Sequence, residues 1–298
     1  GAQAWPSRQV RIVVPLPAGG GPDAVARMFG NALSQKWGQP VVIENLPGAD
    51  GSTGAAAFVR SADDHALLYS IASVITVNPR VQKQMGFAPT DDLKPIAPVA
   101  NAVLAVAVHT DVRARTLSEL VALAKAAPDG MAWGAGPSLP RFAFMALLKK
   151  AQTSLRYVPY RDLATPQADL GQGRIQVLVT SLAAMRAPVE QGKAHILAIT
   201  SASRAPMLPS VSTAREAGHP EMEIDGLSGF FGGRGMGDGL RTNIAADIQN
   251  VGAEPSVRAK IEASGQFVVL GGPAEFAAGI ERQHRQVSAI ASLIDLSN

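Results

Sequence analysis

The sequence predicts an α/β protein built on mostly parallel sheets. Short β-branched apolar runs alternate along the chain with amphipathic stretches of helical period, which is typical of strand–helix–strand units. With 298 residues, 47% of them hydrophobic, the chain can bury a sizeable core. About ten strands would make a large single sheet, so two lobes joined by short crossovers are the more economical arrangement.

In the first part of the chain, helices are predicted from the spacing of apolar residues and strands from β-branched content. The stretch 22–37 places Val25, Phe29 and Leu33 on one face and ends before Gly38. The same periodicities are repeated further along. The expected strands are 10–14, 41–43, 67–71 and 103–108, and the expected helices are 22–37, 54–61 and 117–127.

The second part continues this alternation. Residues 116–119 read Thr-Leu-Ser-Glu, a capping box that opens a helix. Pro140 and Pro166 stand where helices should begin, because proline suits a first helical turn. The expected strands are 131–133, 156–158, 175–179, 195–200, 227–231 and 267–270; the expected helices begin at 140, 166 and about 182 and span 239–252, 255–264 and 273–293.

Composition excludes several classes of protein. The net charge is +3 and aromatic residues make up 5%, with no basic cluster, so nucleic-acid binding is not expected. The absence of cysteine rules out disulfides, thiolate metal sites and a cysteine nucleophile. The histidines lack metal-binding or catalytic spacing, so we expect no catalytic residue, no metal and no cofactor. They are His65, His109, His195, His219 and His284.

Two glycine-rich loops carry the functional prediction. The first spans 13–23 and the second 45–54, and each follows a strand pattern and precedes a helical one. Backbone N–H groups at two neighbouring helix N-termini would suit a small carboxylate or phosphate. Asp23 and Asp50 would cap or brace their own loops, or either could bind the amino group of a zwitterionic ligand. The plainer interpretation is that these glycines only supply positive φ angles in tight turns.

A dinucleotide site is the enzymatic alternative. Residues 19–24 match the G-x-G-x-x-A fingerprint of a dinucleotide-binding oxidoreductase, and Glu44 follows at about the expected distance. Residues 15–18 separate the strand from these glycines, whereas the fingerprint needs the turn directly after the strand. Pro22 also stiffens that turn, and no Walker lysine follows either loop.

Further small polar loops are expected at the same sheet edges, where ligands of open α/β sheets bind. They would give a cleft lined by hydroxyl and amide groups, which suits recognition better than chemistry. Each hydroxyl has the alternative role of capping its own helix. The loops are 70–76 with Asn78, 134–138, 161–165 and 180–181, and the cations near them are Arg141, Arg161 and Arg186.

Taken together, these motifs resemble the substrate-binding proteins of tripartite tricarboxylate transporters, the Bug receptors of the bacterial periplasm. The match spans nearly the whole chain. The segments that carry it are 5–6, 12–23, 38–45, 47–51, 78–79, 158–161, 169–173, 208–211 and 216–218.

The resemblance implies a two-lobed type II periplasmic-binding-protein fold, the Venus-flytrap arrangement, with a ligand cleft between the lobes. One lobe would be 1–103 plus 224–298 and the other 104–223. In that family the first two glycine loops hold one ligand carboxylate. The implied ligand-binding residues are Pro17, Ala18, Gly19, Gly20, Ala49, Asp50, Gly51, Ser52, Thr53 and Ser73 from the first lobe, and Ser138, Arg141, Asp162 and Ser181 from the second.

The chain departs from the family pattern where the ligand would be selected. Arg141 stands where a histidine is common, and Asp162 replaces the usual glycine. If Arg141 faces the ligand a dicarboxylate is favoured, whereas Asp162 would favour an amino acid.

The resemblance also implies partners and a compartment. We expect a monomeric periplasmic receptor that delivers a small carboxylated solute to membrane transporter subunits, and a sensor subunit using the same cleft is the other possibility. The residues at 2–4, Ala-Gln-Ala, are typical of the cleavage site of an exported precursor whose signal peptide is removed.

Overall fold

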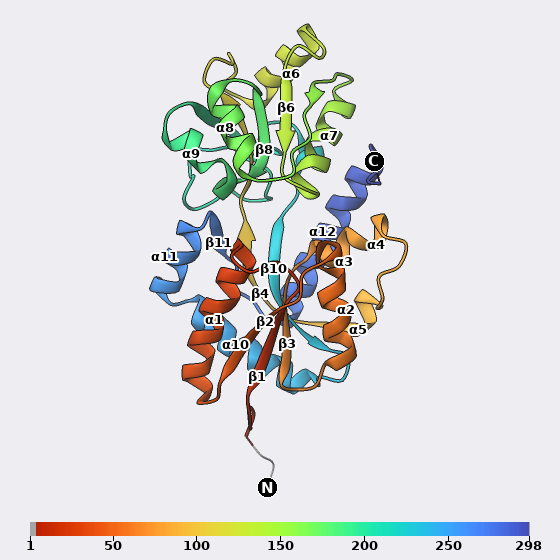
Figure 1. Ribbon diagram of the computed structural model, residues 1–298, viewed down its shortest axis with the longest axis vertical. Helices are drawn as coiled ribbons and strands as arrows, with labels where there is room; N and C mark the ends of the chain where they lie inside the picture. The colour runs from red at the N-terminus through yellow and green to blue at the C-terminus, as the bar shows by residue number, and fades with distance from the viewer. Residues whose placement is uncertain (1–3, 298) are drawn as a thin grey trace. The chain divides into compact units, whose positions relative to one another are not determined.

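The structure is a computed structural model that describes residues 4–297 (Figure 1). Most of the expected cleavage-site remnant at 2–4 therefore lies outside the described residues. The chain divides into two compact units. The first runs to Asn101 and includes Leu227–Ser264 and Val268–His284; the second holds Ala102–Gly226, Gly265–Phe267 and the residues after His284. The lobe boundaries expected from the sequence stay a prediction.

A six-stranded sheet forms the centre of the first unit, in the order β11-β4-β10-β3-β1-β2. β1 pairs in parallel with β2 and β3, whereas β10 is antiparallel to β3. The strands are β1 (Val10–Val14), β2 (Val41–Asn45), β3 (Ala66–Ile71), β4 (Leu93–Ala102), β10 (Gly226–Gly233) and β11 (Gln266–Val268). The helices are α1 (Gly21–Trp37), α2 (Ser52–Ser61), α3 (Ser73–Thr76), α4 (Asn78–Val81), α5 (Pro89–Asp92), α10 (Asp238–Gly252), α11 (Pro255–Ala263) and α12 (Pro273–Ala291). Residues 266–267 of β11 and 285–291 of α12 belong to the second unit.

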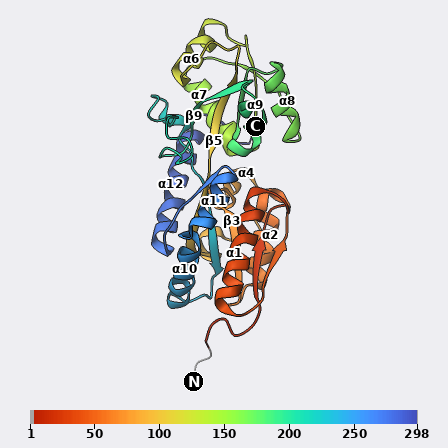
Figure 2. The same ribbon diagram turned by 90° about the vertical axis from the view of Figure 1, so that its left-hand side faces the viewer.

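Helices cover both faces of this sheet (Figures 1 and 2). Ile12 of β1 packs in a cluster with residues of α1, α10 and α11, while the neighbouring Val13 packs with residues of α2 and α12. Because successive side chains of a strand point to opposite faces, a strand covered on both sides is expected to be mostly apolar. Four of the five residues of β1 are valine or isoleucine, and the exception, Arg11, is half-buried and forms an ion pair of 2.9 Å with Glu44.

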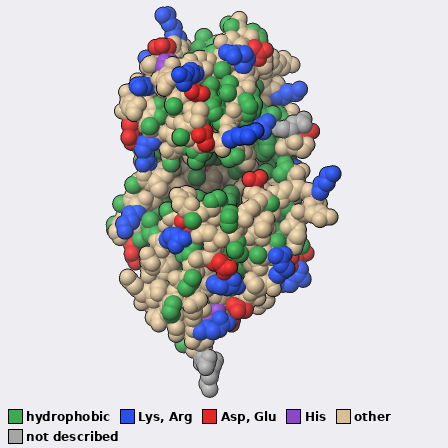
Figure 3. All heavy atoms as spheres, viewed as in Figure 1, with side chains coloured by type: hydrophobic (Ala, Val, Ile, Leu, Met, Phe, Trp, Pro, Cys, Tyr) green, Lys and Arg blue, Asp and Glu red, His purple; other side chains and the backbone are tan. Residues whose placement is uncertain are grey.

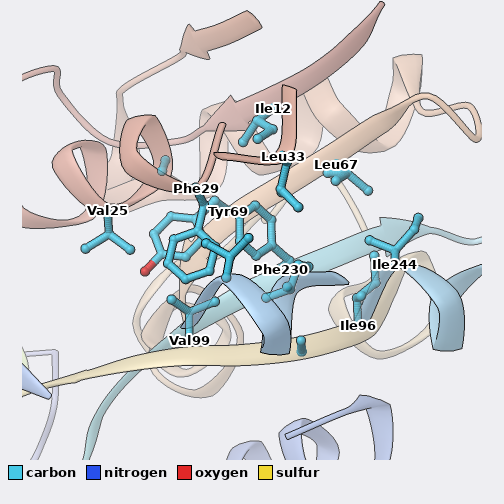
Figure 4. Packing of buried hydrophobic residues seen from close by; sticks show 14 of the residues in the cluster. Ile12, Val25, Phe29, Leu33, Leu67, Tyr69, Ile96, Val99, Phe230 and Ile244 are labelled. Atoms are coloured by element: carbon cyan, nitrogen blue, oxygen red, sulfur yellow. The ribbon is translucent and has the colours of Figure 1, made fainter. Parts of the chain in front are cut away.

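Three aromatic rings form the middle of the first cluster (Figure 4). Phe230 lies 5.9 Å from Phe29 and 4.9 Å from Tyr69, centroid to centroid, in tilted contacts. The Tyr69 hydroxyl, fully buried, shares a hydrogen bond of 2.7 Å with Ser228 Oγ. Each such ring contributes about 1.5–3 kcal/mol by burial. The cluster thus ties α1 to β3 and β10.

The second unit holds a five-stranded sheet in the order β7-β6-β8-β5-β9. β6 is parallel to β7 and β8, and β5 is antiparallel to β8 and β9. The strands are β5 (Leu104–His109), β6 (Ala132–Ala135), β7 (Arg156–Tyr157), β8 (Val177–Ser181) and β9 (Ala194–Ile199). The helices are α6 (Leu117–Ala126), α7 (Leu139–Lys150), α8 (Ala164–Gln172) and α9 (Arg186–Glu190), with 3-10 turns η2 (Leu182–Met185) and η3 (Pro220–Met222).

The predicted α/β class is confirmed, with corrections in detail. Both sheets are mixed rather than mostly parallel, because β10 runs against β3, and β5 runs against β8 and β9. The strand β4 was missed, and the helix expected near Leu182 is a 3-10 turn followed by α9. None of the helices in the described chain has the length and hydropathy needed to cross a membrane. On the face shown in Figure 3, basic and acidic side chains are scattered over each unit.

Candidate functional site

The two glycine-rich loops leave the first sheet at the same edge. Loop A (residues 15–20) joins β1 to α1, and loop B (residues 46–51) joins β2 to α2. Val14 and Asn45, the last residues of the two strands, are register partners, and Leu46 N–H donates to Val14 O at 2.9 Å. β3 lies on the other side of β1, so strand order reverses at β1. Such a switch point is where open α/β sheets bind ligands.

A buried carboxylate holds loop A in place. Asp23, in the first turn of α1, is 4% exposed and accepts a hydrogen bond of 2.9 Å from Gly19 N–H. Asn45 Nδ2 donates to the other carboxylate oxygen at 2.8 Å, and Arg27 Nε donates at 3.1 Å. Asn45 also donates to Leu16 O at 3.3 Å. The bracing role predicted for Asp23 is confirmed, and the brace extends to the end of β2.

The same contacts set the charge of Asp23. Burial acts to raise the pKa of this carboxyl, but the hydrogen bonds from Gly19, Asn45 and Arg27 outweigh it and hold the pKa below its usual value. A carboxylate that accepts several hydrogen bonds is stabilised in its charged form. Asp23 therefore serves loop A as a fixed anion.

Loop B is held from its other side by amide side chains. Asn78 is 4% exposed, and its Nδ2 donates to Asp50 O at 3.0 Å and to Ser52 Oγ at 2.9 Å. Gln82 Nε2 donates to Ala49 O at 2.8 Å. These bonds satisfy two carbonyl oxygens of loop B and hold its backbone in place.

Close backbone approach explains Gly54, the third residue of α2. A Cβ at this position would lie 2.7 Å from Pro15 Cα and would also collide with Leu46 O. Gly51 has a φ of +100°, and its Cβ would lie 2.6 Å from Val74 Cγ2. Glycine is therefore required for α2 to begin against both loops.

The residues predicted to bind ligand in the first unit differ in accessibility. Gly51, Ser52 and Ser73 are buried, and Ser52 Oγ accepts from Asn78 as described above. Gly19 N–H is already bonded to Asp23. The predicted residues on the exposed surface of the two loops and of the first turn of α2 are Pro17, Ala18, Gly19, Gly20, Ala49, Asp50 and Thr53.

The second unit repeats this local arrangement. β6 lies between its parallel neighbours β7 and β8, so the segments that follow these strands share one sheet edge. Gly136 N–H donates to Val179 O at 2.9 Å, and a Cβ on Gly136 would lie 2.5 Å from Thr180 Oγ1. Ser138 precedes α7 with a φ of +65°, rare for a residue with a side chain.

Arg141 and Tyr157 are brought together at this edge. Arg141 lies in the first turn of α7, and its Cζ stands 4.9 Å from the ring centroid of Tyr157 in β7. Tyr157 in turn packs at 4.9 Å against Trp133 of β6. A guanidinium over an aromatic face is held by cation–π attraction, worth about 0.5–1 kcal/mol at an exposed site.

Asp162 and Ser181 hold their own backbone. Asp162 accepts from Thr165 N–H at 3.3 Å and from Thr165 Oγ1 at 2.8 Å, which fixes the start of α8. Ser181 Oγ accepts from Ala184 N–H at 3.3 Å and caps η2. Arg161 is exposed, and Arg186 lies 3.8 Å from Glu190 in an i,i+4 ion pair.

Sequence reasoning missed the residues that hold the loops. Asn45, Arg27 and Gln82 were not singled out, although Asn45 ends a strand beside a glycine loop, where a buried amide often braces a turn. Among residues 4–297, no group of three or more histidines and carboxylates is arranged to hold a metal.

The geometry of loop A also bears on the dinucleotide alternative. β1 ends at Val14 and α1 begins at Gly21, so six residues separate strand and helix. The fingerprint needs its first glycine directly after the strand. No feature of the described loop favours a pyrophosphate over a single carboxylate.

Known proteins resemble this chain over most of its length. The family model of the tripartite tricarboxylate transporter family receptor, TctC, matches residues 25–292. A protein of Pseudomonas sp. strain P51, from the tcbD–tcbE intergenic region, is 30% identical over 278 residues, covering 91% of this chain and 81% of that protein. BugT of Bordetella pertussis is 29% identical over 224 residues, covering 74% of this chain and 69% of BugT.

Solved structures of solute-binding proteins also resemble this chain. A TctC solute-binding protein from Polaromonas has a TM-score of 0.83 at 25% identity, covering 97% of this chain and 100% of that one. The periplasmic binding protein BugD has a TM-score of 0.74 at 25% identity, with 97% of each chain covered. With its two mixed α/β sheets and its paired glycine loops, the chain belongs to the tripartite tricarboxylate transporter receptor family of solute-binding proteins.

Proposed function

We propose that this chain is an exported periplasmic receptor that binds a small organic carboxylate and delivers it to the membrane subunits of a tripartite transporter. The observation that supports it most is the pair of braced loops at the ends of β1 and β2. Family membership supports it independently of the loops.

One ligand carboxylate is assigned to loops A and B. α1 and α2 begin directly after these loops, so their positive dipole ends favour an anion there. Hydrogen bonds to a charged group contribute about 1.5–3 kcal/mol each. The exposed residues Pro17, Ala18, Gly20, Ala49 and Thr53 form the surface that the carboxylate would meet, while Gly19 and Asp50 shape the backbone.

The other end of the ligand is assigned to Ser138, Arg141 and Ser181 of the second unit, and Arg141 favours a second carboxylate. Asp162 is engaged with Thr165, which weakens the case for an amino acid. Two structures that share this fold, an R. palustris protein with adipate at 24% identity and MatC with malate at 23%, hold dicarboxylates. A monomer with lobes 1–103 plus 224–298 and 104–223 completes the proposal.

A thermal-shift screen tests this function. The panel contains adipate, malate, glutamate, NAD and, as a matched uncharged control, dimethyl adipate. A ligand at 100 times its Kd adds about 2.7 kcal/mol to stability, and each kcal/mol raises the Tm by roughly 2–4 °C in a chain of this size. We expect a dicarboxylate to raise the Tm and the diester to leave it unchanged.

One outcome would contradict the proposed function, and another would contradict only the role of Arg141. A shift with NAD and none with any carboxylate would favour the dinucleotide alternative. A dicarboxylate shift that Arg141→Gln leaves intact would remove Arg141 from the site while keeping the receptor. Delivery is tested separately, by capture of the ligand-loaded receptor on the transporter's membrane subunits.

A further inference from the structure

A serine, a histidine and a glutamate of the second unit are joined by hydrogen bonds, and none of the three belongs to the loops described above. Ser118 Oγ lies 3.1 Å from His219 Nε2, and His219 Nδ1 lies 3.2 Å from Glu221 Oε1. The serine is 101 residues upstream of the histidine, so the fold alone brings them together.

The partners define the protonation pattern of these three side chains. The Glu221 side chain is 5% exposed and that of His219 17%, whereas Ser118 is exposed. A carboxylate can only accept, so Nδ1 carries the hydrogen and Nε2 presents its lone pair to the serine hydroxyl. Lys150 Nζ lies 3.5 Å from Glu221 Oε2, a favourable position for a carboxylate's charge. This is the order of contacts found in base-activated serine nucleophiles.

The position of Ser118 at the start of a helix would also help to stabilise negative charge beside it. It is the second residue of the ten-residue helix α6, whose cap Thr116 accepts from Glu119 N–H at 3.1 Å. The first N–H groups of a helix have no partner within the helix and favour negative charge. An oxyanion formed on an acyl group attached to Ser118 would lie near this helix end.

We propose that Ser118 is an activated nucleophile that accepts acyl groups from exposed, activated esters. Ser118 Oγ bonds to the carbonyl carbon, its proton passes to His219 Nε2, and the ester C–O bond breaks as the leaving oxygen takes that proton. Water then attacks the acyl-serine in the same way and releases the carboxylic acid and Ser118. His219 is the base and Glu221 a positioning residue that fixes the tautomer of His219.

One contact limits the rate. The Ser118 hydroxyl also lies 3.2 Å from Ala217 O, so its proton has a second acceptor. This contact slows the attack of Ser118 on the ester, so the rate at which Ser118 acquires a covalent adduct is the quantity to measure. A positioned general base contributes about 10²–10⁴-fold to such a step.

Mass spectrometry after exposure of the intact protein to a fluorophosphonate or to p-nitrophenyl acetate tests the proposal. Ser256 is a matched internal control, because it is exposed and also occupies the second position of a helix, α11. We expect Ser118 to be modified at least about 100-fold faster than Ser256, within the range for general-base assistance. Ser118→Ala should abolish this adduct.

Variants of the other two residues separate chemistry from folding. His219→Asn should bring the Ser118 rate to within a few-fold of the Ser256 rate. Glu221→Gln should lower the rate of Ser118 modification, and Glu221→Asp should restore part of that rate. The circular dichroism spectrum of each variant checks its fold. If the variants at His219 or Glu221 fail to fold, the comparison of the Ser118 and Ser256 rates in the unaltered chain still tests the proposal. Equal modification of the two serines, no adduct on Ser118, or a rate unaffected by His219→Asn would overturn the proposal.

Discussion

Replacing Asp23 with asparagine removes the anion that holds loop A while keeping the size of the side chain. The carboxylate accepts from Gly19 N–H, Asn45 Nδ2 and Arg27 Nε. An asparagine can accept on only one atom, so its amide group would face one of these donors. The hydrogen bond from Gly19 or the one from Asn45 should then be lost, while the contact between Asn45 and Leu16 O remains.

The expected cost follows from these contacts. The bond that keeps an oxygen acceptor loses about 1 kcal/mol when that acceptor becomes neutral, and the donor that faces the amide group costs about 1–3 kcal/mol. Arg27 is 51% exposed, so its ion pair adds little after solvent screening. Burying a neutral amide costs less free energy than burying a charged carboxylate, and this difference offsets part of the loss. The net effect is a loss of about 1–3 kcal/mol of unfolding free energy.

Urea unfolding measures the loss in stability, and calorimetric titration with the dicarboxylate found in the screen measures the loss in affinity. Asp247→Asn is the matched control. Asp247 accepts from Trp37 Nε1 at 2.8 Å, at the opposite end of α1 from the loops, so this variant should weaken stability and leave affinity unchanged. An Asp23→Asn protein with unaltered stability, or with no greater loss of affinity than Asp247→Asn, would refute the reasoning.

Two further predictions concern the same loops. Gly54→Ala should lower the free energy of unfolding by about 1–3 kcal/mol, because the added Cβ meets backbone atoms of both loops. Gly239→Ala is the control: its added Cβ would have nothing within 4 Å, so urea unfolding should show unchanged or slightly higher stability. Equal effects of the two substitutions would contradict the packing argument. The lowered pKa of Asp23 means that its contribution is complete above the unfolded value near 3.9 and is lost as pH falls through the lower folded value. The stability difference between the unaltered protein and Asp23→Asn should therefore shrink from pH 5 to pH 3, and a constant difference would show that the charge of Asp23 is not what matters.

The sequence was sufficient for elements with a strong local pattern. β1, α1 and the capped helix α6 were predicted to within a residue or so, because each carries its periodicity and end signals in one short stretch. β4 was missed because Pro95 and Pro98 interrupt its pattern, and proline usually argues against a strand with neighbours on both sides. The sequence also did not reveal which neighbouring strands are antiparallel, because a strand that follows a long connection can run in either direction.

The candidate site shows the same limit. The glycine loops were predicted because their composition is local, but the residues that hold them come from other elements. Asn78 and Ser52 are 26 residues apart, and Ser118 and His219 are 101 apart. Buried polar side chains must find partners, and sequence alone does not say which. Long-range pairings of this kind therefore became visible only in the folded chain.

The most direct test of the central claim is to map where the ligand meets the backbone. Amide chemical shifts of the ¹⁵N-labelled protein, followed during titration with the dicarboxylate that raises the Tm, report each N–H group separately. We expect the largest shifts at Ala18, Gly20, Ala49 and Thr53, with dimethyl adipate causing none. Saturable binding whose shifts gather elsewhere and leave loops A and B unchanged would contradict the account.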